Sequence, residues 1–275
     1  MYRLVASDLD ETLLDDSHHV PERVRRAVAA ARQLGVRFVP ATGRPFGSVD
    51  VTLSELGLLG QKGEYVISFN GGVITENSSG VPLTTCSLPR ETAERIYSYG
   101  VERNICMHVN TLDPVYLYNY VPEERAYIEG RMNIVETFDP TLDAIYDAGQ
   151  IVVKIIYMNL DLDYLRLVER ELAVAGVTDG LDVYYSGNRY LEFNAPGVNK
   201  GAGLLELARR LGIRREETMA IGDNSNDAAM LRAAGLGIAV ANASPEALSA
   251  ADYVCKADNN AGGVAEAIER FVLGA

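Results

Sequence analysis

Short β-type runs alternate with helix-type segments at both ends of the chain. Near the start, "YRLVAS" (2–7) is followed by a helix-type segment (21–35) and then by "VRFVPATGR" (36–44). The helix-type segment has apolar residues at helical spacing, a proline near its beginning and a glycine after its end. Strands that are joined by helices form parallel sheets with helices on both faces. The sequence therefore predicts an α/β fold with a doubly wound, mainly parallel, Rossmann-like sheet.

The middle of the chain differs in composition from the two ends. It is richer in tyrosine, and strand candidates such as "IVVKIIYM" (151–158) alternate with helix candidates such as "LDYLRLVERELAVAG" (162–176). From about residue 189 the alternation of strand-type and helix-type segments seen near the start returns, and "TMAIG" (218–222) runs into a polar turn. We therefore expect a core α/β domain built from 1–82 and 189–275, and an inserted α+β domain at 83–188.

Composition excludes some classes of partner. The chain carries 25 basic and 38 acidic side chains, a formal net charge of -13, which argues against nucleic acid because phosphate backbones need a basic face. Three widely spaced cysteines, Cys86, Cys106 and Cys255, do not suit a disulfide framework and favour a cytoplasmic location. The N-terminus lacks a signal-peptide pattern, and no apolar run reaches the ~18 residues that span a bilayer, so we expect no membrane anchor.

Four polar turns follow candidate core strands or begin a helix. They are "DLDET" (8–12), "ATGR" (41–44), "NK" (199–200) and "GDNSND" (222–227). Because the strand ends of a parallel sheet lie on one edge, these turns can converge despite their distance in sequence. The side chains brought together would be Asp8, Asp10, Thr12, Thr42, Lys200, Asp223, Asn226 and Asp227.

This set of side chains restricts the chemistry. Carboxylate ligands without histidine or cysteine suit Mg²⁺ rather than zinc or copper, and a lysine with hydroxyl and amide donors suits a phosphoryl group. A carboxylate beside a metal can attack phosphorus to form an aspartyl-phosphate. On a strand, Asp10 would face the same way as Asp8, so that it could protonate the leaving oxygen.

The four turns resemble the motifs of the haloacid dehalogenase-like (HAD) phosphohydrolases. "DLDET" is similar to their nucleophile motif, "ATGR" to the second motif, Lys200 to the third and "GDNSND" to the fourth. "SFNGG" (68–72) and the insert between the second and third motifs resemble the Cof-type sugar-phosphate phosphatases, in which the insert is a cap domain. The resemblance covers the whole chain, with the four motifs in the family's order.

The resemblance implies a role for each matching residue. Asp8 would be the nucleophile and a Mg²⁺ ligand, and Asp10 would be the general acid and base, with a backbone carbonyl that also binds the metal. Asp223 would be the third protein ligand, and Asp227 would support the metal through its water or through Lys200. The phosphate group would be held by Thr42, Gly43, Arg44, Asn70, Lys200 and Asn226.

Several readings stay open at this point. Asn70 with its two following glycines is either a plain turn or a substrate contact, and Arg44 is either a surface charge or a phosphate contact. Glu192 and Asn194 are read as structural residues of the returning strand. Glu11, at the variable position of the first motif, is expected to point away from the site. The histidines are read as non-catalytic: His18, His19 and His108.

The function predicted from the sequence is a Mg²⁺-dependent phosphatase that hydrolyses a small phosphorylated metabolite, such as a sugar phosphate, through an aspartyl-phosphate on Asp8. The cap is expected to disfavour large protein substrates. The alternatives are a phosphomutase with the same fold and a non-enzymatic switch phosphorylated on Asp8. We expect a monomer or a weak homo-oligomer. The sequence does not identify the substrate, because specificity depends on cap residues whose pairing it does not reveal.

Overall fold

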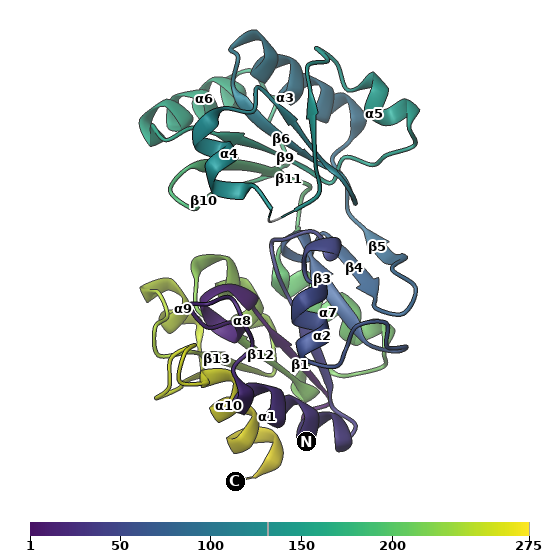
Figure 1. Cartoon of the computed structure of the whole chain (residues 1–275). Helices are drawn as coiled ribbons and strands as arrows, with labels where there is room; N and C mark the ends of the chain where they lie inside the picture. Colours follow the sequence, from purple (N-terminus) through teal and green to yellow (C-terminus); the bar gives the residue numbers. More distant parts are fainter. Residues whose placement is uncertain (131, 275) are drawn as a thin grey trace. The chain divides into compact units, whose positions relative to one another are not determined.

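The computed structural model describes residues 1–130 and 132–274, and the chain divides into two compact units (Figure 1). The first unit combines Met1–Thr84 with Asn199–Ala275, and the second is Thr85–Val198. The second border therefore lies at 198 and not at the expected 188. The reason is that β11 (Tyr190–Asn194) pairs with β9 (Lys154–Met158) in the sheet of the second unit.

The first unit is built on a five-stranded parallel sheet in the order β14-β13-β12-β1-β2. The two central strands are buried along their whole length, as expected when helices cover both faces of a parallel sheet. The strands are β1 (Leu4–Ser7), β2 (Arg37–Pro40), β12 (Thr218–Gly222), β13 (Leu236–Ala239) and β14 (Tyr253–Val254).

Helices cover both faces of this sheet, because alternate strand residues point to opposite sides. Val5 joins the hydrophobic core under α1 and α10, whereas its neighbours Leu4 and Ala6 join the core under α7 and α8. This arrangement confirms the doubly wound fold. The helices are α1 (Glu22–Gln33), α2 (Asp50–Glu55), α7 (Lys200–Arg210), α8 (Ala228–Ala233), α9 (Pro245–Ala250) and α10 (Gly263–Ile268).

One expected strand of the main sheet lies elsewhere. β3 (Tyr65–Ser68) forms a small sheet with β4 (Val73–Glu76) and β5 (Pro82–Thr85), in the order β3-β4-β5. It touches the main sheet's edge through a single parallel bridge between Ala41 and Ile67. The turn after β3 reverses the chain into an antiparallel partner, so a crossover helix is not needed there.

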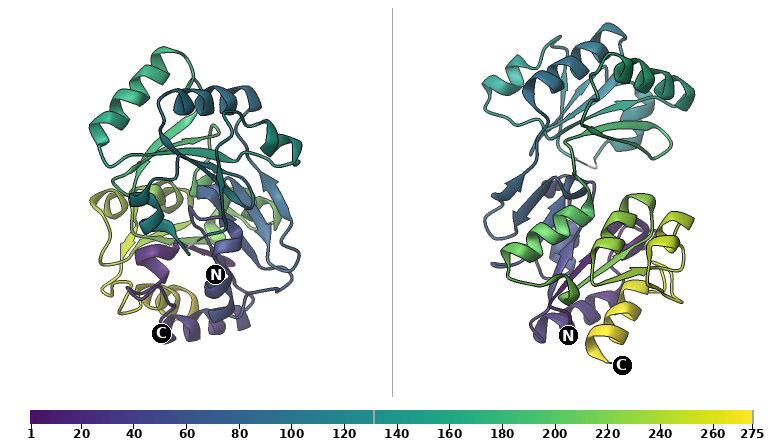
Figure 2. Two further views of the ribbon diagram at one scale, coloured as in Figure 1. Left: turned by 45° about the horizontal axis from the view of Figure 1, so that its top comes forward. Right: turned by 180° about the vertical axis from the view of Figure 1, so that it is seen from behind.

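The second unit is a six-stranded mixed sheet in the order β10-β11-β9-β6-β7-β8, with α3 and α6 on one face (Figures 1 and 2). Its core is dominated by the side chains that point toward these two helices, which matches the predicted α+β insert. The remaining strands are β6 (Cys106–Asn110), β7 (Val115–Tyr118), β8 (Ile134–Thr137) and β10 (Asp182–Ser186), and the helices are α3 (Arg90–Glu102), α4 (Pro122–Ile128), α5 (Asp143–Asp147) and α6 (Leu162–Val174).

All three cysteines are free thiols, and Cys106 and Cys255 are buried. Within residues 1–130 and 132–274, none of the helices is both long and apolar enough to cross a bilayer.

Candidate active site

The polar turns meet at one edge of the five-stranded sheet. Asp8 follows β1, the loop 41–44 follows β2, and Asp223 follows β12, and these three strands are parallel neighbours. Lys200 is the first residue of α7, whose start is capped by the Asn199 side chain accepting a hydrogen bond from the Ala202 amide. Parallel register therefore brings together residues that are more than two hundred positions apart, as the sequence predicted.

Lys200 lies at the centre of the cluster. Its side chain is fully buried, and Nζ donates to Asp8 Oδ1 at 2.5 Å and to Asp227 Oδ1 at 2.6 Å. Burial alone would lower the pKa of Lys200, but the charges and hydrogen bonds of the two carboxylates raise it above its ordinary value. The lysine is therefore held as a cation between the predicted nucleophile and its neighbour.

Two carboxylates of the cluster, Asp8 and Asp223, are destabilised as anions. Burial raises the pKa of Asp8 well above its ordinary value, the charges of Asp227 and Asp223 raise it further, and the charge and hydrogen bond of Lys200 lower it in part. Burial likewise raises the pKa of Asp223 to about 6, although the Thr12 hydroxyl donates to its Oδ1 at 2.6 Å and lowers it in part. Three buried carboxylates thus face one ammonium group.

This arrangement fits a divalent cation. Asp8, Asp223 and Asp227 each offer one carboxylate oxygen, and the three oxygens lie within 4.8 Å of one another. Asp227 is also fixed in place, because its Oδ2 accepts from the Asp223 and Asn224 amides at 3.1 and 3.0 Å. A hard, oxygen-only donor set of this kind suits Mg²⁺.

The residues expected on the phosphate side lie beside each other. The Asn70 amide donates to the Thr42 carbonyl at 2.9 Å, and Asn226 Nδ2 donates to Asn70 Oδ1 at 3.4 Å. A side chain on Gly43 would meet Asn70 Oδ1 at 3.1 Å. Thr42, Gly43, Asn70 and Asn226 therefore form one patch, which brings the second motif, the glycine-rich turn and the fourth motif together.

Gly71 explains part of the glycine-rich turn. It has a φ of +99°, and a Cβ there would lie 2.1 Å from the Asn199 carbonyl oxygen. Only glycine permits this approach of the turn to the first residues of α7. Gly71 is thus needed for packing beside Lys200. A contact of Asn70 with substrate stays a prediction.

Arg44 and Asp10 form a pair that the sequence analysis missed. Arg44 Nε donates to Asp10 Oδ2 at 2.9 Å, and Nη2 donates to Oδ1. The expected placement of Asp10 by strand alternation is wrong, because β1 ends at Ser7 and Leu9–Leu13 form an irregular turn in which Glu11 has a φ of 58°. The expected pairing of the first two strands could have indicated this contact. Ser7 lies opposite Pro40, and the opposite charges of Asp10 and Arg44 lie a few residues beyond this pair.

The other acidic residues of the first loop have structural contacts. Glu11 is exposed and outside the cluster, as expected, and its carbonyl accepts from Asn242. Asp15, expected to be solvated, is half-buried, and its Oδ1 accepts from the amides of Ser17 and His19. These acceptors therefore hold the loop that carries Asp8 and Asp10.

The histidine and strand residues of doubtful role also have partners. His19 lies 2.6 Å from Glu55, and His108 is buried in the second unit with its Nε2 3.0 Å from Glu124. Glu192 accepts from Lys154 Nζ at 2.6 Å inside the sheet of the second unit, so it is not on a returning core strand. These contacts support the structural readings.

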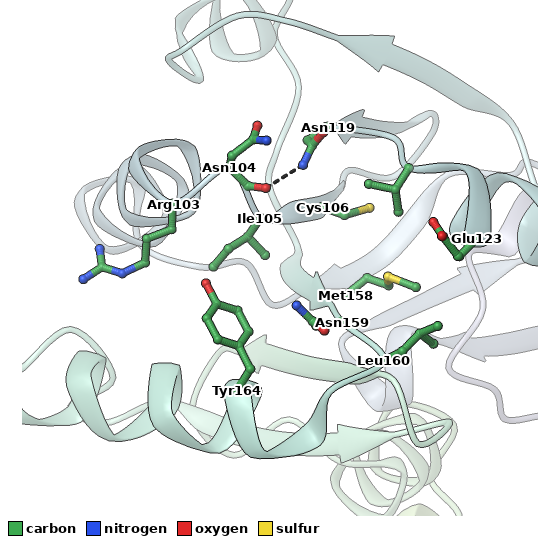
Figure 3. Close-up of a pocket in the computed structure, with 11 residues that line it drawn as sticks. Arg103, Asn104, Ile105, Cys106, Asn119, Glu123, Met158, Asn159, Leu160 and Tyr164 are labelled. Atoms are coloured by element: carbon green, nitrogen blue, oxygen red, sulfur yellow. Dashed lines mark hydrogen bonds between the residues drawn. The ribbon is translucent and has the colours of Figure 1, made fainter.

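A cavity of about 300 Å³ lies in the second unit, between the beginning of β6 and the end of β9 (Figure 3). It is lined by Asn104, Cys106 and Tyr164 among others, and Asn119 Nδ2 donates to the Asn104 carbonyl across its wall. Burial raises the pKa of the Cys106 thiol to about 11, so this sulfur is a poor nucleophile. The motif residues do not line this cavity.

Comparisons with known proteins agree with the motifs. The sequence profile of the haloacid dehalogenase-like hydrolases matches residues 5–268. A Bacillus subtilis (strain 168) protein named "Putative phosphatase YxeH" is 33% identical over 99% of both chains. Another B. subtilis protein, 5-amino-6-(5-phospho-D-ribitylamino)uracil phosphatase YcsE, is 29% identical over 98% of this chain and 96% of its own length.

A solved structure shows the same fold. The haloacid dehalogenase-like hydrolase from Bacteroides thetaiotaomicron is 31% identical, has a TM-score of 0.86, and covers 98% of this chain and 99% of its own. Profile, sequence and structure thus agree with the resemblance drawn from the four motifs. The chain belongs to the haloacid dehalogenase-like hydrolases and is an enzyme of that family.

Proposed function

We propose that the chain is a Mg²⁺-dependent phosphatase that hydrolyses a phosphate monoester of a small metabolite through an aspartyl-phosphate on Asp8. The observation that carries this proposal is the contact of the buried Lys200 ammonium with both Asp8 and Asp227. This contact places the buried Asp8 carboxylate beside the Lys200 cation, at a sheet edge that also bears hydroxyl and amide donors. Such a site suits an anionic electrophile.

Asp8 and Asp10 divide the two chemical steps. An Asp8 carboxylate oxygen attacks phosphorus, the bond from phosphorus to the leaving oxygen breaks, and the Asp10 carboxylic acid gives its proton to that oxygen. Water then attacks the phosphorus of the aspartyl-phosphate and gives a proton to the Asp10 carboxylate. The phosphorus–Asp8 bond breaks, which releases phosphate and restores both carboxyl groups.

The remaining residues bind charge. Mg²⁺ held by Asp8, Asp223, Asp227 and the Asp10 carbonyl would offset the negative charge of the phosphoryl oxygens. Thr42 accepts a hydrogen bond from the Arg44 amide at 3.1 Å, which leaves its hydroxyl proton for a phosphate oxygen. Asn226 is exposed at the same patch and supplies a further amide donor, while Lys200 orients Asp8 and balances its charge.

The substrate class is a sugar phosphate or a related small phosphate ester. The relative named 5-amino-6-(5-phospho-D-ribitylamino)uracil phosphatase supports this choice, since its named substrate carries phosphate on a sugar-alcohol chain. The chain is proposed to act in the cytoplasm as a monomer or weak homo-oligomer, and its three free thiols suit a reducing compartment.

The test is hydrolysis of 4-nitrophenyl phosphate by the purified protein with Mg²⁺ and with EDTA. We expect turnover that needs Mg²⁺ and that Asp8→Asn abolishes, because the amide removes the attacking oxygen anion at unchanged size. An inert wild type, or an Asp8→Asn variant as active as the wild type, contradicts the proposal. Phosphate release from hexose, pentose, triose and nucleotide phosphates then ranks the substrates, and an isomerised sugar phosphate without free phosphate identifies a mutase instead.

A further inference from the structure

The paired contact of Arg44 with Asp10 lies at the solvent-accessible side of the site. The Arg44 and Asp10 side chains are 35% and 45% exposed, in contrast to the buried Lys200 cluster. Two nitrogens of one guanidinium meet both oxygens of one carboxylate. This is the two-point geometry that arginine makes with carboxylates and with phosphates alike.

The backbone of Arg44 is anchored, so that only its side chain is free to change partner. Its amide donates to Thr42 Oγ1 at 3.1 Å, and its carbonyl accepts from the Phe69 amide at 3.2 Å. These contacts hold Arg44 in the same loop as the hydroxyl of Thr42, beside Asn70. The backbone of Arg44 therefore lies beside the phosphate-side patch, while its guanidinium is engaged with the residue that must protonate the leaving group.

We propose that Arg44 is a positioning residue that exchanges the Asp10 carboxylate for the phosphate of the substrate. This inference rests on the proposed phosphatase function. Without substrate, the Arg44 guanidinium fixes the orientation of the Asp10 carboxylate through this paired contact. A phosphate dianion carries more charge than one carboxylate and offers the same two-point geometry, so it competes for the guanidinium. Asp10 is then released toward the leaving oxygen of the bound ester.

The exchange gives Arg44 two separable effects. Losing Arg44 weakens phosphate binding, and it also removes the coupling that places Asp10 when phosphate arrives. The second effect depends on the leaving group, since nitrophenolate leaves without a proton whereas phenolate needs one. A purely structural role for Arg44 would lower the turnover of both esters equally.

The experiment compares 4-nitrophenyl and phenyl phosphate in wild type, Arg44→Ala, Arg44→Lys, Asp10→Asn and the Asp10→Asn/Arg44→Ala double variant. We expect Arg44→Ala to lower kcat for phenyl phosphate about tenfold more than for 4-nitrophenyl phosphate, a fraction of the full effect of a general acid. Arg44→Lys keeps the positive charge but lacks the two-point contact of the guanidinium. Its kcat difference between the two esters should therefore lie between those of wild type and Arg44→Ala. In the Asp10→Asn background, removing Arg44 should add no further leaving-group dependence.

Calorimetric titration with inorganic phosphate in Mg²⁺ supplies a readout besides activity, and we expect a several-fold weaker Kd in Arg44→Ala. The matched control is Arg23→Gln, because Arg23 also meets both oxygens of a carboxylate, Glu269, at 3.2 and 2.6 Å, and is 44% exposed. It should change neither measurement. Equal losses for both esters, or an unchanged phosphate Kd, overturn the exchange in an active enzyme, whereas an inert wild type overturns the proposed function itself.

Discussion

Replacement of Lys200 by methionine tests the electrostatic arrangement of the site. The ammonium lies 2.5 Å from Asp8 and 2.6 Å from Asp227, and its side chain is fully buried. Methionine has a similar length but no charge, so it leaves these carboxylates buried without a counter-charge. Breaking a buried ion pair in this way costs about 3–5 kcal/mol, and we expect a loss of that size in the free energy of unfolding with EDTA at pH 8.

Two conditions should reduce this loss. Mg²⁺ replaces the missing positive charge, and a ligand present at 100 times its Kd stabilises the folded state by about 2.7 kcal/mol. Low pH also reduces the loss, because the pKa of Asp8, already raised by burial and by neighbouring carboxylates, rises further without Lys200. A raised folded-state pKa gives stability at low pH that is lost as the pH rises, so the Lys200→Met penalty should be smaller at pH 5 than at pH 8.

The assay is urea unfolding followed by circular dichroism, with Lys154→Met as the matched control. Lys154 is a buried lysine of the second unit, 2.6 Å from Glu192. Its loss should destabilise the protein without any change in the response to Mg²⁺. The reasoning is refuted if Lys200→Met costs less than about 1 kcal/mol, the scale of an exposed ion pair, or if Mg²⁺ stabilises it no more than it stabilises the wild type.

Two further predictions concern the loop packing and the pH dependence. Gly71→Ala should cost about 3 kcal/mol, from overpacking against the Asn199 carbonyl and from the left-handed backbone, and should lower kcat, whereas Gly47→Ala, which meets open space, should stay within about 0.5 kcal/mol. Equal thermal shifts for the two variants would contradict this. In EDTA, the pKa of Asp223 is raised to about 6 from 3.8. This shift stabilises the folded state at low pH by up to about 3 kcal/mol, and the stabilisation is lost as the pH rises through 6. Wild type should therefore lose more stability from pH 5 to 8 than Asp223→Asn, and identical pH slopes would refute the assignment.

Local sequence patterns predicted the elements that carry the site. Helix α1 begins at Glu22 after Pro21, buries Val24, Ala27, Val28 and Ala31, and ends before Gly35, which has the left-handed backbone expected at a helix end. Parallel register then explains why separated motifs converge. These features depend on periodicity and on the direction of strands, which a sequence displays directly.

Features that depend on tertiary pairing were not predicted. β11 was assigned to the core because its apolar residues do not reveal which sheet they join, and only the pairing with β9 places it in the second unit. Asp10 was placed by strand alternation, but β1 ends at Ser7, and the turn that follows directs Asp10 to Arg44. Such contacts join residues that are distant in sequence and meet only in the folded chain, so the periodicity of the sequence does not indicate them.

The most direct test of the account is to identify the phosphorylated residue. Asp10→Asn enzyme with Mg²⁺ is mixed with 4-nitrophenyl phosphate, quenched in acid and digested with trypsin, since loss of the base slows hydrolysis of the aspartyl-phosphate. Mass spectrometry should find one phosphoryl group on the peptide 4–23, at Asp8, and none after Asp8→Asn is added. A phosphoryl group on another residue, or an active enzyme in which this peptide is never phosphorylated, would contradict the mechanism.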